Sequence, residues 1–342
     1  LIGSFTGDSR VYDGTTNATD QAINAQLDGV ELEDDGFVEL VINAASYNSK
    51  NVSEAHTITA TDVSLGGDEA SNYSIVAGAV SAASGTITPK DAYIQPYYAW
   101  KTFGEEISPP QPFDQWDLVG SDFVTDVDMS CDGWAYNANV GDYNISVSNA
   151  SNPDDPFLNT NYDFTYYGQQ FDVEKLDITG HFSVANKVYD GTTDATLQDF
   201  YLETVPEWDR DNVALVIEAN FASPNAGGQE IVLSDYGLTG SSSGNYNLLD
   251  AINDTPYAEI EQRYVYGTFV AADKVYDGTL DAYVVETTLG AVPGEENTGI
   301  INDDLIYLYV SAMFSDKNVG DNIDVNSLFA ALYSDGDVES QN

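Results

Sequence analysis

The stretch Val11-Tyr12-Asp13-Gly14-Thr15-Thr16-Asn17-Ala18-Thr19 occurs a second time, with one substitution, as Val188-Tyr189-Asp190-Gly191-Thr192-Thr193-Asp194-Ala195-Thr196. A shorter third copy is Val275-Tyr276-Asp277-Gly278-Thr279-Leu280-Asp281-Ala282. The second and third tyrosines are 87 positions apart, and the first and second are 177 apart, about twice that interval. Self-similarity at a fixed period is the signature of a tandem array, so a unit without the motif is predicted between the first two copies.

Two further blocks recur in the same order and with a similar period. An Asn-Val-Gly-like block returns at intervals of 88, 86 and 93 residues, at Asn51, Asn139, Asn225 and Asn318. An Asn-Tyr block follows it at Asn72, Asn161 and Asn245, each time ahead of a closing apolar strand. The blocks predict four units with the boundaries 1–90, 91–178, 179–263 and 264–342. The fourth unit lacks the Asn-Tyr block and the closing strand, so it is predicted to be incomplete.

Each unit has a β pattern. Tyr143–Ser148 alternates with a period of two, and Val213–Ile217 is a β-branched run typical of a strand buried on both faces. Gly, Asn, Asp and Ser cluster between such runs as turns. Short strands at this spacing in a unit of about 87 residues predict an all-β chain, a tandem array of four immunoglobulin-like β-sandwiches. Only 20–27 and 327–333 are predicted as brief helices.

Charge and composition exclude several classes of protein. Ten Lys and Arg stand against 57 Asp and Glu, a formal charge of -47, so a nucleic-acid binder or a protein that docks on anionic membranes is not expected. Apolar residues make up 42% of the chain, enough to build cores under an acidic surface. A single Cys131 and only two His make an intrachain disulfide impossible and a zinc site or Ser–His or Cys–His catalysis improbable. No enzyme activity is expected, and no apolar run of about 18 residues suggests a membrane span.

The ordered blocks resemble the YDG-type repeats of large secreted bacterial surface proteins. Unit 91–178 opens with Tyr98-Ala99-Trp100-Lys101-Thr102-Phe103-Gly104 in place of Tyr-Asp-Gly, and it is similar to the related MBG-type repeats. The resemblance covers nearly the whole chain. It implies an extracellular location on the bacterial cell surface, an adhesin stalk built from such repeats, and no catalytic residues.

The repeated motif has a physical interpretation of its own. Asp-Gly suits a tight reversal, because Gly accepts a positive φ and the Asp carboxylate accepts hydrogen bonds from nearby backbone N–H groups. The tyrosine before it is predicted to pack in a core or at a junction between units; a tyrosine-lined glycan patch is the alternative. The predicted structural turn motif comprises Tyr12, Asp13, Gly14, Tyr189, Asp190, Gly191, Tyr276, Asp277 and Gly278.

Acidic residues recur just ahead of the central strand of each unit. Calcium takes six to eight oxygen ligands, commonly carboxylates and backbone carbonyls, so paired Asp on loops are candidate calcium ligands. The alternative is that they are solvated turn residues. The candidates are Asp34, Asp35, Asp209, Asp211, Asp303 and Asp304, with Asp126, Asp128 and Asp132 near the corresponding place in the second unit. Calcium is the only cofactor that the sequence suggests.

Three functions are compatible with this reading. The first is a structural stalk whose partners are neighbouring repeats. The second is a subunit of a homopolymeric extracellular filament, in which an identical neighbour completes the last sandwich. The third is a carbohydrate-binding module for a host or matrix glycan, with Trp100 and Trp116 as the candidate glycan face.

Overall fold

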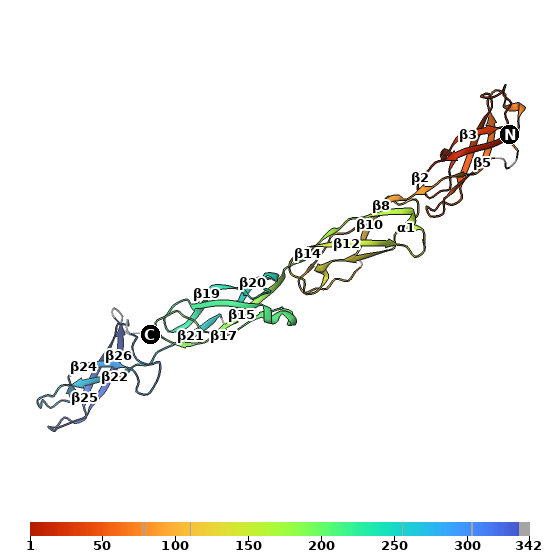
Figure 1. Cartoon of the computed structure of the whole chain (residues 1–342). Helices are drawn as coiled ribbons and strands as arrows, with labels where there is room; N and C mark the ends of the chain where they lie inside the picture. Colours follow the sequence, from red (N-terminus) through yellow and green to blue (C-terminus); the bar gives the residue numbers. More distant parts are fainter. Residues whose placement is uncertain (77, 79, 110, 255, 302–303, 335–342) are drawn as a thin grey trace. The chain divides into compact units, whose positions relative to one another are not determined.

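A computed structural model describes residues 1–334 of the chain except 77, 79, 110, 255, 302 and 303 (Figure 1). The chain divides into two compact units, Leu1–Lys175 and Leu176–Asn342. Each unit contains two of the predicted repeats, and the repeats are called one to four here in chain order. The prediction of an all-β chain of β-sandwich repeats is confirmed.

The strands follow the predicted repeats. Repeat one contains β1 (Ile2–Gly7), β2 (Arg10–Val11), β3 (Ala22–Asp28), β4 (Glu39–Tyr47), β5 (Thr57–Gly66), β6 (Ala83–Ser84) and β7 (Ile87–Thr88). Repeat two contains β8 (Lys90–Pro96), β9 (Ala99–Thr102), β10 (Phe113–Trp116), β11 (Asp126–Ser130), β12 (Gly141–Ser151), β13 (Tyr162–Tyr166) and β14 (Gln169–Glu174). Repeat three contains β15 (Leu176–Val184), β16 (Lys187–Val188), β17 (Leu197–Glu203), β18 (Ala214–Phe221), β19 (Gly227–Thr239), β20 (Tyr246–Asn253) and β21 (Tyr257–Glu261). Repeat four contains β22 (Tyr266–Ala271), β23 (Asp281–Ala282), β24 (Val284–Gly290), β25 (Ile306–Phe314) and β26 (Val325–Ser334).

Among the described residues, helical structure is confined to short segments of one or two turns. These segments are α1 (Leu158–Asn161) and the 3₁₀ segments η1 (Thr19–Gln21), η2 (Ala70–Asn72), η3 (Asp132–Trp134), η4 (Glu207–Asn212) and η5 (Ser243–Asn245). The two predicted helices were wrong: most of 20–27 lies in β3, and 327–333 lies in β26. Among the described residues, no helix is long and apolar enough to cross a membrane.

Repeat three shows the complete sandwich. One sheet has the order β17-β15-β20 and the other has the order β16-β21-β19-β18. The start of the repeat therefore contributes to both sheets, first through β15 and then through β16. The last two strands, β20 and β21, run parallel to these two strands and close both sheets. Repeat two has the same arrangement, with sheets β10-β8-β13 and β11-β12-β14-β9.

The closing strand places a large apolar residue at the centre of each complete repeat. Ile87, Val173 and Ile260 occupy this position, and none is more than 2% exposed. Strand β15 crosses the predicted boundary between 178 and 179, because its alternating inward residues Ile178 and Phe182 belong to the core of repeat three. The third repeat thus begins at Leu176.

Candidate functional site

The Tyr-Asp-Gly motif folds as the predicted turn. Asp13 Oδ1 accepts a hydrogen bond from the Thr15 N–H at 2.8 Å, and Asp190 and Asp277 do the same at 2.9 Å for Thr192 and Thr279. The glycine has a φ of 77°, 79° and 82° in the three copies, so the turn uses the left-handed conformation that favours Gly.

A basic side chain clamps each turn from two residues ahead of the tyrosine. Lys187 Nζ donates to Asp190 Oδ1 and to the Thr192 carbonyl, both at 2.8 Å, and it lies 5.4 Å from the centre of the Phe221 ring. The same contacts are made by Arg10 in repeat one and by Lys274 in repeat four. The cation thus binds the carboxylate, the backbone and an aromatic face of its own repeat, and it fixes the position of the tyrosine.

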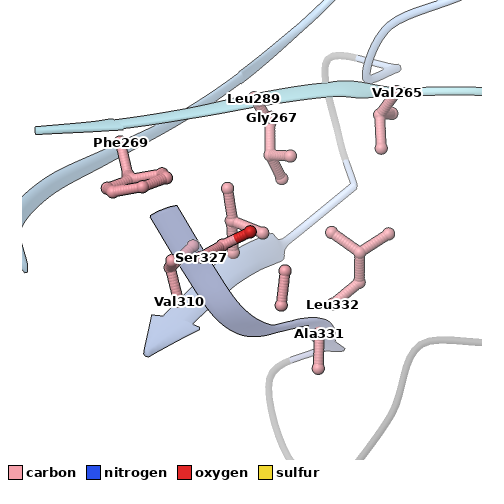
Figure 2. Close-up of a pocket in the computed structure, with 10 residues that line it drawn as sticks. Val265, Gly267, Phe269, Leu289, Val310, Ser327, Ala331 and Leu332 are labelled. Carbon is pink, nitrogen blue, oxygen red and sulfur yellow. The ribbon is translucent and has the colours of Figure 1, made fainter. Parts of the chain in front are cut away.

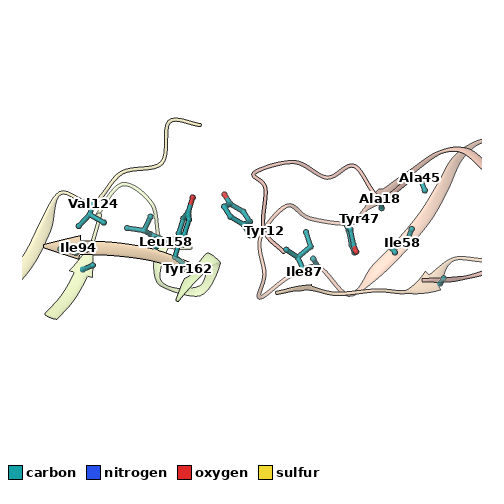
Figure 3. Close-up of a cluster of buried hydrophobic side chains, with 14 of the residues drawn as sticks. Tyr12, Ala18, Ala45, Tyr47, Ile58, Ile87, Ile94, Val124, Leu158 and Tyr162 are labelled. Atoms are coloured by element: carbon teal, nitrogen blue, oxygen red, sulfur yellow. The ribbon is translucent and has the colours of Figure 1, made fainter. Parts of the chain in front are cut away.

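The first tyrosine joins repeat one to repeat two. Tyr12 is 2% exposed, and its hydroxyl donates to Asp122 Oδ2 at 3.0 Å. Tyr162 of repeat two donates to the same oxygen at 2.7 Å, and the two rings meet edge to face with centroids 5.3 Å apart. Figure 3 shows Tyr12 and Tyr162 facing one another across this joint, continuous with the core residues on both sides.

Amides close the joint beside the tyrosines. Asn161 is 1% exposed; its Oδ1 accepts from the Val52 N–H at 2.9 Å, and its Nδ2 donates to Asn51 Oδ1 at 3.2 Å. Lys90 Nζ donates to the Asp117 carbonyl at 2.6 Å. The Asn-Val and Asn-Tyr blocks that recur in the sequence therefore meet here, one from each repeat.

Repeats three and four are joined by the same kind of contact. Tyr189 is 6% exposed, and its hydroxyl donates to Asp304 Oδ1 at 2.9 Å. Arg263 donates through Nε to the Gly299 carbonyl at 2.8 Å, and through Nη1 to the Tyr189 carbonyl at 3.3 Å. Ile301, three residues ahead of Asp304, packs on the core of repeat three.

Burial raises the pKa of both joint tyrosines. For Tyr189 the pKa rises to about 12, mainly through desolvation and then through the hydrogen bond to Asp304. Desolvation and the Asp122 carboxylate likewise raise the pKa of Tyr12. Both hydroxyls therefore stay protonated and donate at physiological pH.

Four aspartates, one in each repeat, occupy equivalent positions at the end of a turn. The backbone N–H of each aspartate donates to the carbonyl of the residue three positions earlier. These N–H···O distances are 2.9–3.0 Å for Asp34, Asp122, Asp209 and Asp304. In repeats one to three the aspartate also accepts a hydroxyl from the Asn-Tyr tyrosine: Tyr73 at 2.6 Å, Tyr162 at 2.7 Å and Tyr246 at 2.6 Å. The position is thus an acceptor for tyrosine.

This arrangement bears on the calcium prediction. Asp34, Asp209 and Asp304 accept tyrosine hydroxyls, and the 2% exposed Asp209 also accepts from Asn212 and Ser242. Asp35 and Asp211 are exposed, and Asp303 lies outside the described residues. Within the described part of the chain, no group of three or more His, Cys, Asp or Glu is arranged to hold a metal ion. Calcium binding stays a prediction.

Repeat two departs from the motif at the tyrosine. Strand pairing places Lys101 and Phe103 where repeat three has Lys187 and Tyr189. Phe103 is 2% exposed and carries no hydroxyl, while Lys101 is 1% exposed and donates to the Glu105 and Ala135 carbonyls. Burial lowers the pKa of Lys101.

The two candidate glycan-binding tryptophans lie in different sheets. Trp116 belongs to β10, and its ring is nearly parallel to those of Tyr93 and Tyr167, with centroids 5.5 and 6.0 Å away. Trp100 belongs to β9 in the other sheet and is 54% exposed. The structure therefore does not bring Trp100 and Trp116 together in one face.

Fold and joints define a protein built from tandem β-sandwich repeats. Residues 2–83 and 174–255 match the family model described as the YDG domain. These segments correspond to repeats one and three, so the YDG part of the resemblance is confirmed. The MBG-type assignment of repeat two stays a prediction. None of the curated proteins matches the chain.

Two groups of joint residues escaped prediction from sequence. Asp122 was missed in favour of Asp126 and Asp128, which lie within strand β11 itself. The interval from Asp122 to Tyr162 nevertheless matches the intervals of the Asp34–Tyr73 and Asp209–Tyr246 pairs within a few residues. The clamp cations were also missed. Their signal was a basic residue two positions ahead of the motif tyrosine in all three copies, in a chain with only ten Lys and Arg.

Proposed function

We propose that this chain is a non-catalytic structural repeat region, an extended stalk, of a secreted bacterial cell-surface adhesin or surface fibre. The tyrosine–aspartate joint carries the proposal, because it occurs between the two repeats of each unit. A buried hydroxyl bonded to a carboxylate, with apolar packing beside it, holds consecutive repeats as neighbours. Nearest-neighbour contacts of this kind let the length of an array grow with repeat number.

The charge of the chain supports the same role. A formal charge of -47 makes acidic repeats repel one another except where a specific contact joins them. Such repulsion favours separated repeats and opposes collapse and aggregation. The partners of a stalk are its own neighbouring repeats, and its place is outside the cell.

Small-angle scattering tests the stalk directly. A sandwich strand of about ten residues is roughly 33 Å long, so four sandwiches end to end should give a maximum dimension on the order of 130–160 Å. The joint variant Tyr12→Phe/Tyr189→Phe should broaden the distance distribution without loss of β structure by circular dichroism. A compact particle well below that dimension in the unsubstituted chain would contradict the proposal. Antibody labelling of intact bacterial cells tests the location.

Carbohydrate binding is a second candidate, supported by the aromatic cluster of Trp116, Tyr93 and Tyr167. Trp116 is 38% exposed and Tyr167 is 44% exposed, so part of the cluster is available to a ligand. Glycan-array binding that is lost in Trp116→Ala and kept in Trp100→Ala would establish this function. If the unsubstituted chain gives no signal on the array, carbohydrate binding is ruled out as its function and the stalk proposal stands alone.

A further inference from the structure

The first and the closing segments of repeats one to three run parallel to one another. In repeat three, β15 pairs with β20 over six register positions and β16 pairs with β21 over two. In repeat two, β8 pairs with β13 over five positions and β9 pairs with β14 over four. Repeat one has the parallel pair β2–β7 and a parallel bridge between Gly3 and Val80. We call these pairings the parallel ladder of each repeat.

The parallel ladder determines how a pull along the chain acts on a repeat. The chain enters repeat three at Leu176, the start of β15, and leaves it at Glu261, the end of β21. Because the two segments are parallel, entry and exit lie at opposite ends of their shared ladder. Tension therefore shears the ladder along its length, and its hydrogen bonds bear the force together. In an antiparallel hairpin pulled from its open end, by contrast, the bonds break one after another.

Side chains add contacts across the parallel ladder of repeat three. Near its start, Asn247 Nδ2 donates to Asp177 Oδ1 at 2.8 Å. Further along, His181 Nδ1 lies 3.2 Å from Asp254 Oδ1, and the N–H of Asp254 donates to the Phe182 carbonyl at 2.9 Å. Each contact joins the first segment to the closing segment, so each of them opposes sliding.

The far end of this ladder is fastened next to the joint. The N–H of Glu259 donates to Asn186 Oδ1 at 2.9 Å, and the N–H of Tyr189 donates to the Glu261 carbonyl at 2.9 Å. Tyr189 is also the residue whose hydroxyl binds Asp304 of repeat four. The end of the ladder and the joint therefore share one residue.

The core also opposes sliding of the two segments. Ile178 and Phe182 in β15 and Ile260 in β21 point inward, and all three are buried. A slip of one residue in a strand turns its inward side chains to the opposite face. The segments therefore cannot move past each other by small steps without exposing these apolar side chains.

Repeat four provides a contrast within its described residues. Its strands β22 and β24 form one antiparallel pair, and β25 and β26 form another. A groove of about 310 Å³ lies between the two pairs and is lined by Gly267, Phe269, Leu308 and Ala330 among others (Figure 2). Within the part of the chain that the structure describes, the parallel ladder is thus a feature of repeats one to three.

Tension passes from one repeat to the next along a short connection. In the unit Leu1–Lys175, the closing strand β7 ends at Thr88 and the first strand of repeat two, β8, begins at Lys90. Pro89 alone separates them, and its ring restricts the backbone. A pull on the closing strand of repeat one therefore acts almost directly on the first strand of repeat two.

We propose that repeats one to three are mechanical elements, whose parallel ladders resist shear and keep each repeat folded while the chain is under tension. This inference deepens the stalk proposal and rests on it, since a stalk transmits the pull between a cell and the surface that it contacts. Forced unfolding is governed by the rate of unfolding and not by the equilibrium stability alone. The direction in which a repeat is loaded therefore determines how long it survives.

Single-molecule force spectroscopy on the whole chain tests this by pulling repeat three in two directions. Cys131→Ser removes the native thiol, and a pair of cysteines at exposed positions then provides the handles. Lys175→Cys/Gln262→Cys shears the parallel ladder, whereas Asp211→Cys/Ser241→Cys opens the antiparallel pair β18–β19 from its end. Shear should require a several-fold higher force, and the segment should lengthen by roughly 250 Å, its extended length less its folded span. Equal forces in the two directions, or a lower force in shear, would overturn the proposal.

A second pair of substitutions separates the ladder from the general stability of the repeat. Asn247→Ala/Asp254→Ala removes two side-chain contacts with β15, so unfolding in shear at constant force should be about tenfold faster. The force that opens β18–β19 should not change, because both side chains bind residues of β15. An equal acceleration in both directions would show a loss of stability alone and contradict the proposal. Either failure leaves the stalk proposal intact, since the scattering experiment tests the extended array separately.

Discussion

Tyr12 and Tyr162 come from different repeats and donate their hydroxyls to the same carboxylate oxygen, Asp122 Oδ2. Their rings stand at 78° to one another, the edge-to-face arrangement that aromatic pairs prefer. One acidic side chain thus belongs to the interior of repeat two and to its joint with repeat one. The stability of the repeat and the strength of the joint are therefore coupled.

Removing the first joint hydroxyl should destabilise the unit that contains it. Tyr12→Phe keeps the ring and leaves Asp122 with one donor fewer, so we expect a loss of about 1.5–3 kcal/mol in the free energy of unfolding. Unfolding in denaturant measures this loss, and scanning calorimetry provides a second measurement. Tyr276→Phe is the control, because Tyr276 has the same motif position and is 59% exposed; its effect should stay within about 0.5 kcal/mol. Equal losses in both variants would place the effect in the turn and not in the joint.

The second joint can be measured by a double-mutant cycle. Tyr189→Phe and Asp304→Asn remove the two partners of one hydrogen bond, so their effects on unfolding should be non-additive by about 0.5–3 kcal/mol. The pair Tyr12→Phe and Asp304→Asn, whose members lie in different units, should be additive within about 0.5 kcal/mol. Additivity of the first pair would show that the contact contributes nothing to stability.

Alkaline pH should weaken the joint between repeats three and four. The ordinary pKa of tyrosine is 10.0, and that of Tyr189 is raised to about 12. The folded chain therefore holds this proton more tightly than the unfolded chain, and the associated stability, complete below pH 10, is lost as the pH rises toward 12. The loss amounts to about 1.4 kcal/mol per pH unit for this one group. Unfolding free energies from pH 8 to 12 should fall less steeply for Tyr189→Phe than for the unsubstituted chain; equal slopes would contradict the assignment.

The motif glycines form a graded series. A Cβ added at Gly14 would lie 3.0 Å from Val119 Cγ1 across the joint, one at Gly191 would lie 3.4 Å from Ile301 Cγ2, and one at Gly278 would meet nothing within 4 Å. Substitution by Ala at any of them costs about 1–2 kcal/mol for the left-handed conformation. We expect Gly14→Ala to be the most destabilising in thermal unfolding and Gly278→Ala the least. The reverse order would show that the contact across the joint is loose.

Calcium binding at the acidic turns has a separate test. If the turns containing Asp35 and Asp211 bind calcium, millimolar Ca²⁺ should raise the melting temperature more than Mg²⁺ at the same ionic strength, because Ca²⁺ accepts a more flexible set of oxygens. Asp35→Asn/Asp211→Asn should remove the difference. An equal rise with both ions would instead reflect screening of the acidic surface.

The repeat blocks predicted the architecture well because each block has a structural role. The Asp-Gly turn, the Asn-Tyr pair and the closing apolar residue each fall at the same place in every sandwich that contains them. The two predicted helices failed for a clear reason. Ala, Leu and Gln have high intrinsic helix propensities, but propensity contributes little free energy per residue, and the pairing of β3 with β1 and of β26 with β25 overrides it.

The acidic site shows the limit of reasoning from local sequence. Asp34 and Asp209 are conspicuous as acidic pairs, but their partners Tyr73 and Tyr246 lie 39 and 37 residues away. Only the fold brings these partners together, so a carboxylate that accepts a tyrosine hydroxyl and one that faces solvent look the same in the sequence. The sequence predicted that the motif tyrosines pack in a core or at a junction between units, but it did not predict which aspartates accept their hydroxyls.

The contacts in the clamps and joints also limit which basic residues are accessible to proteases. Trypsin-like proteases need an accessible Lys or Arg in an extended segment, and this chain has ten such residues. Arg10, Lys187 and Lys274 are held in turns, Lys101 is buried, and Lys90 and Arg263 bind carbonyls at the joints. Lys50, Lys175, Arg210 and Lys317 are exposed and remain as cleavage sites. Six of the ten basic residues are thus held by contacts within a repeat or at a joint, and four are left for a protease that cleaves after Lys or Arg.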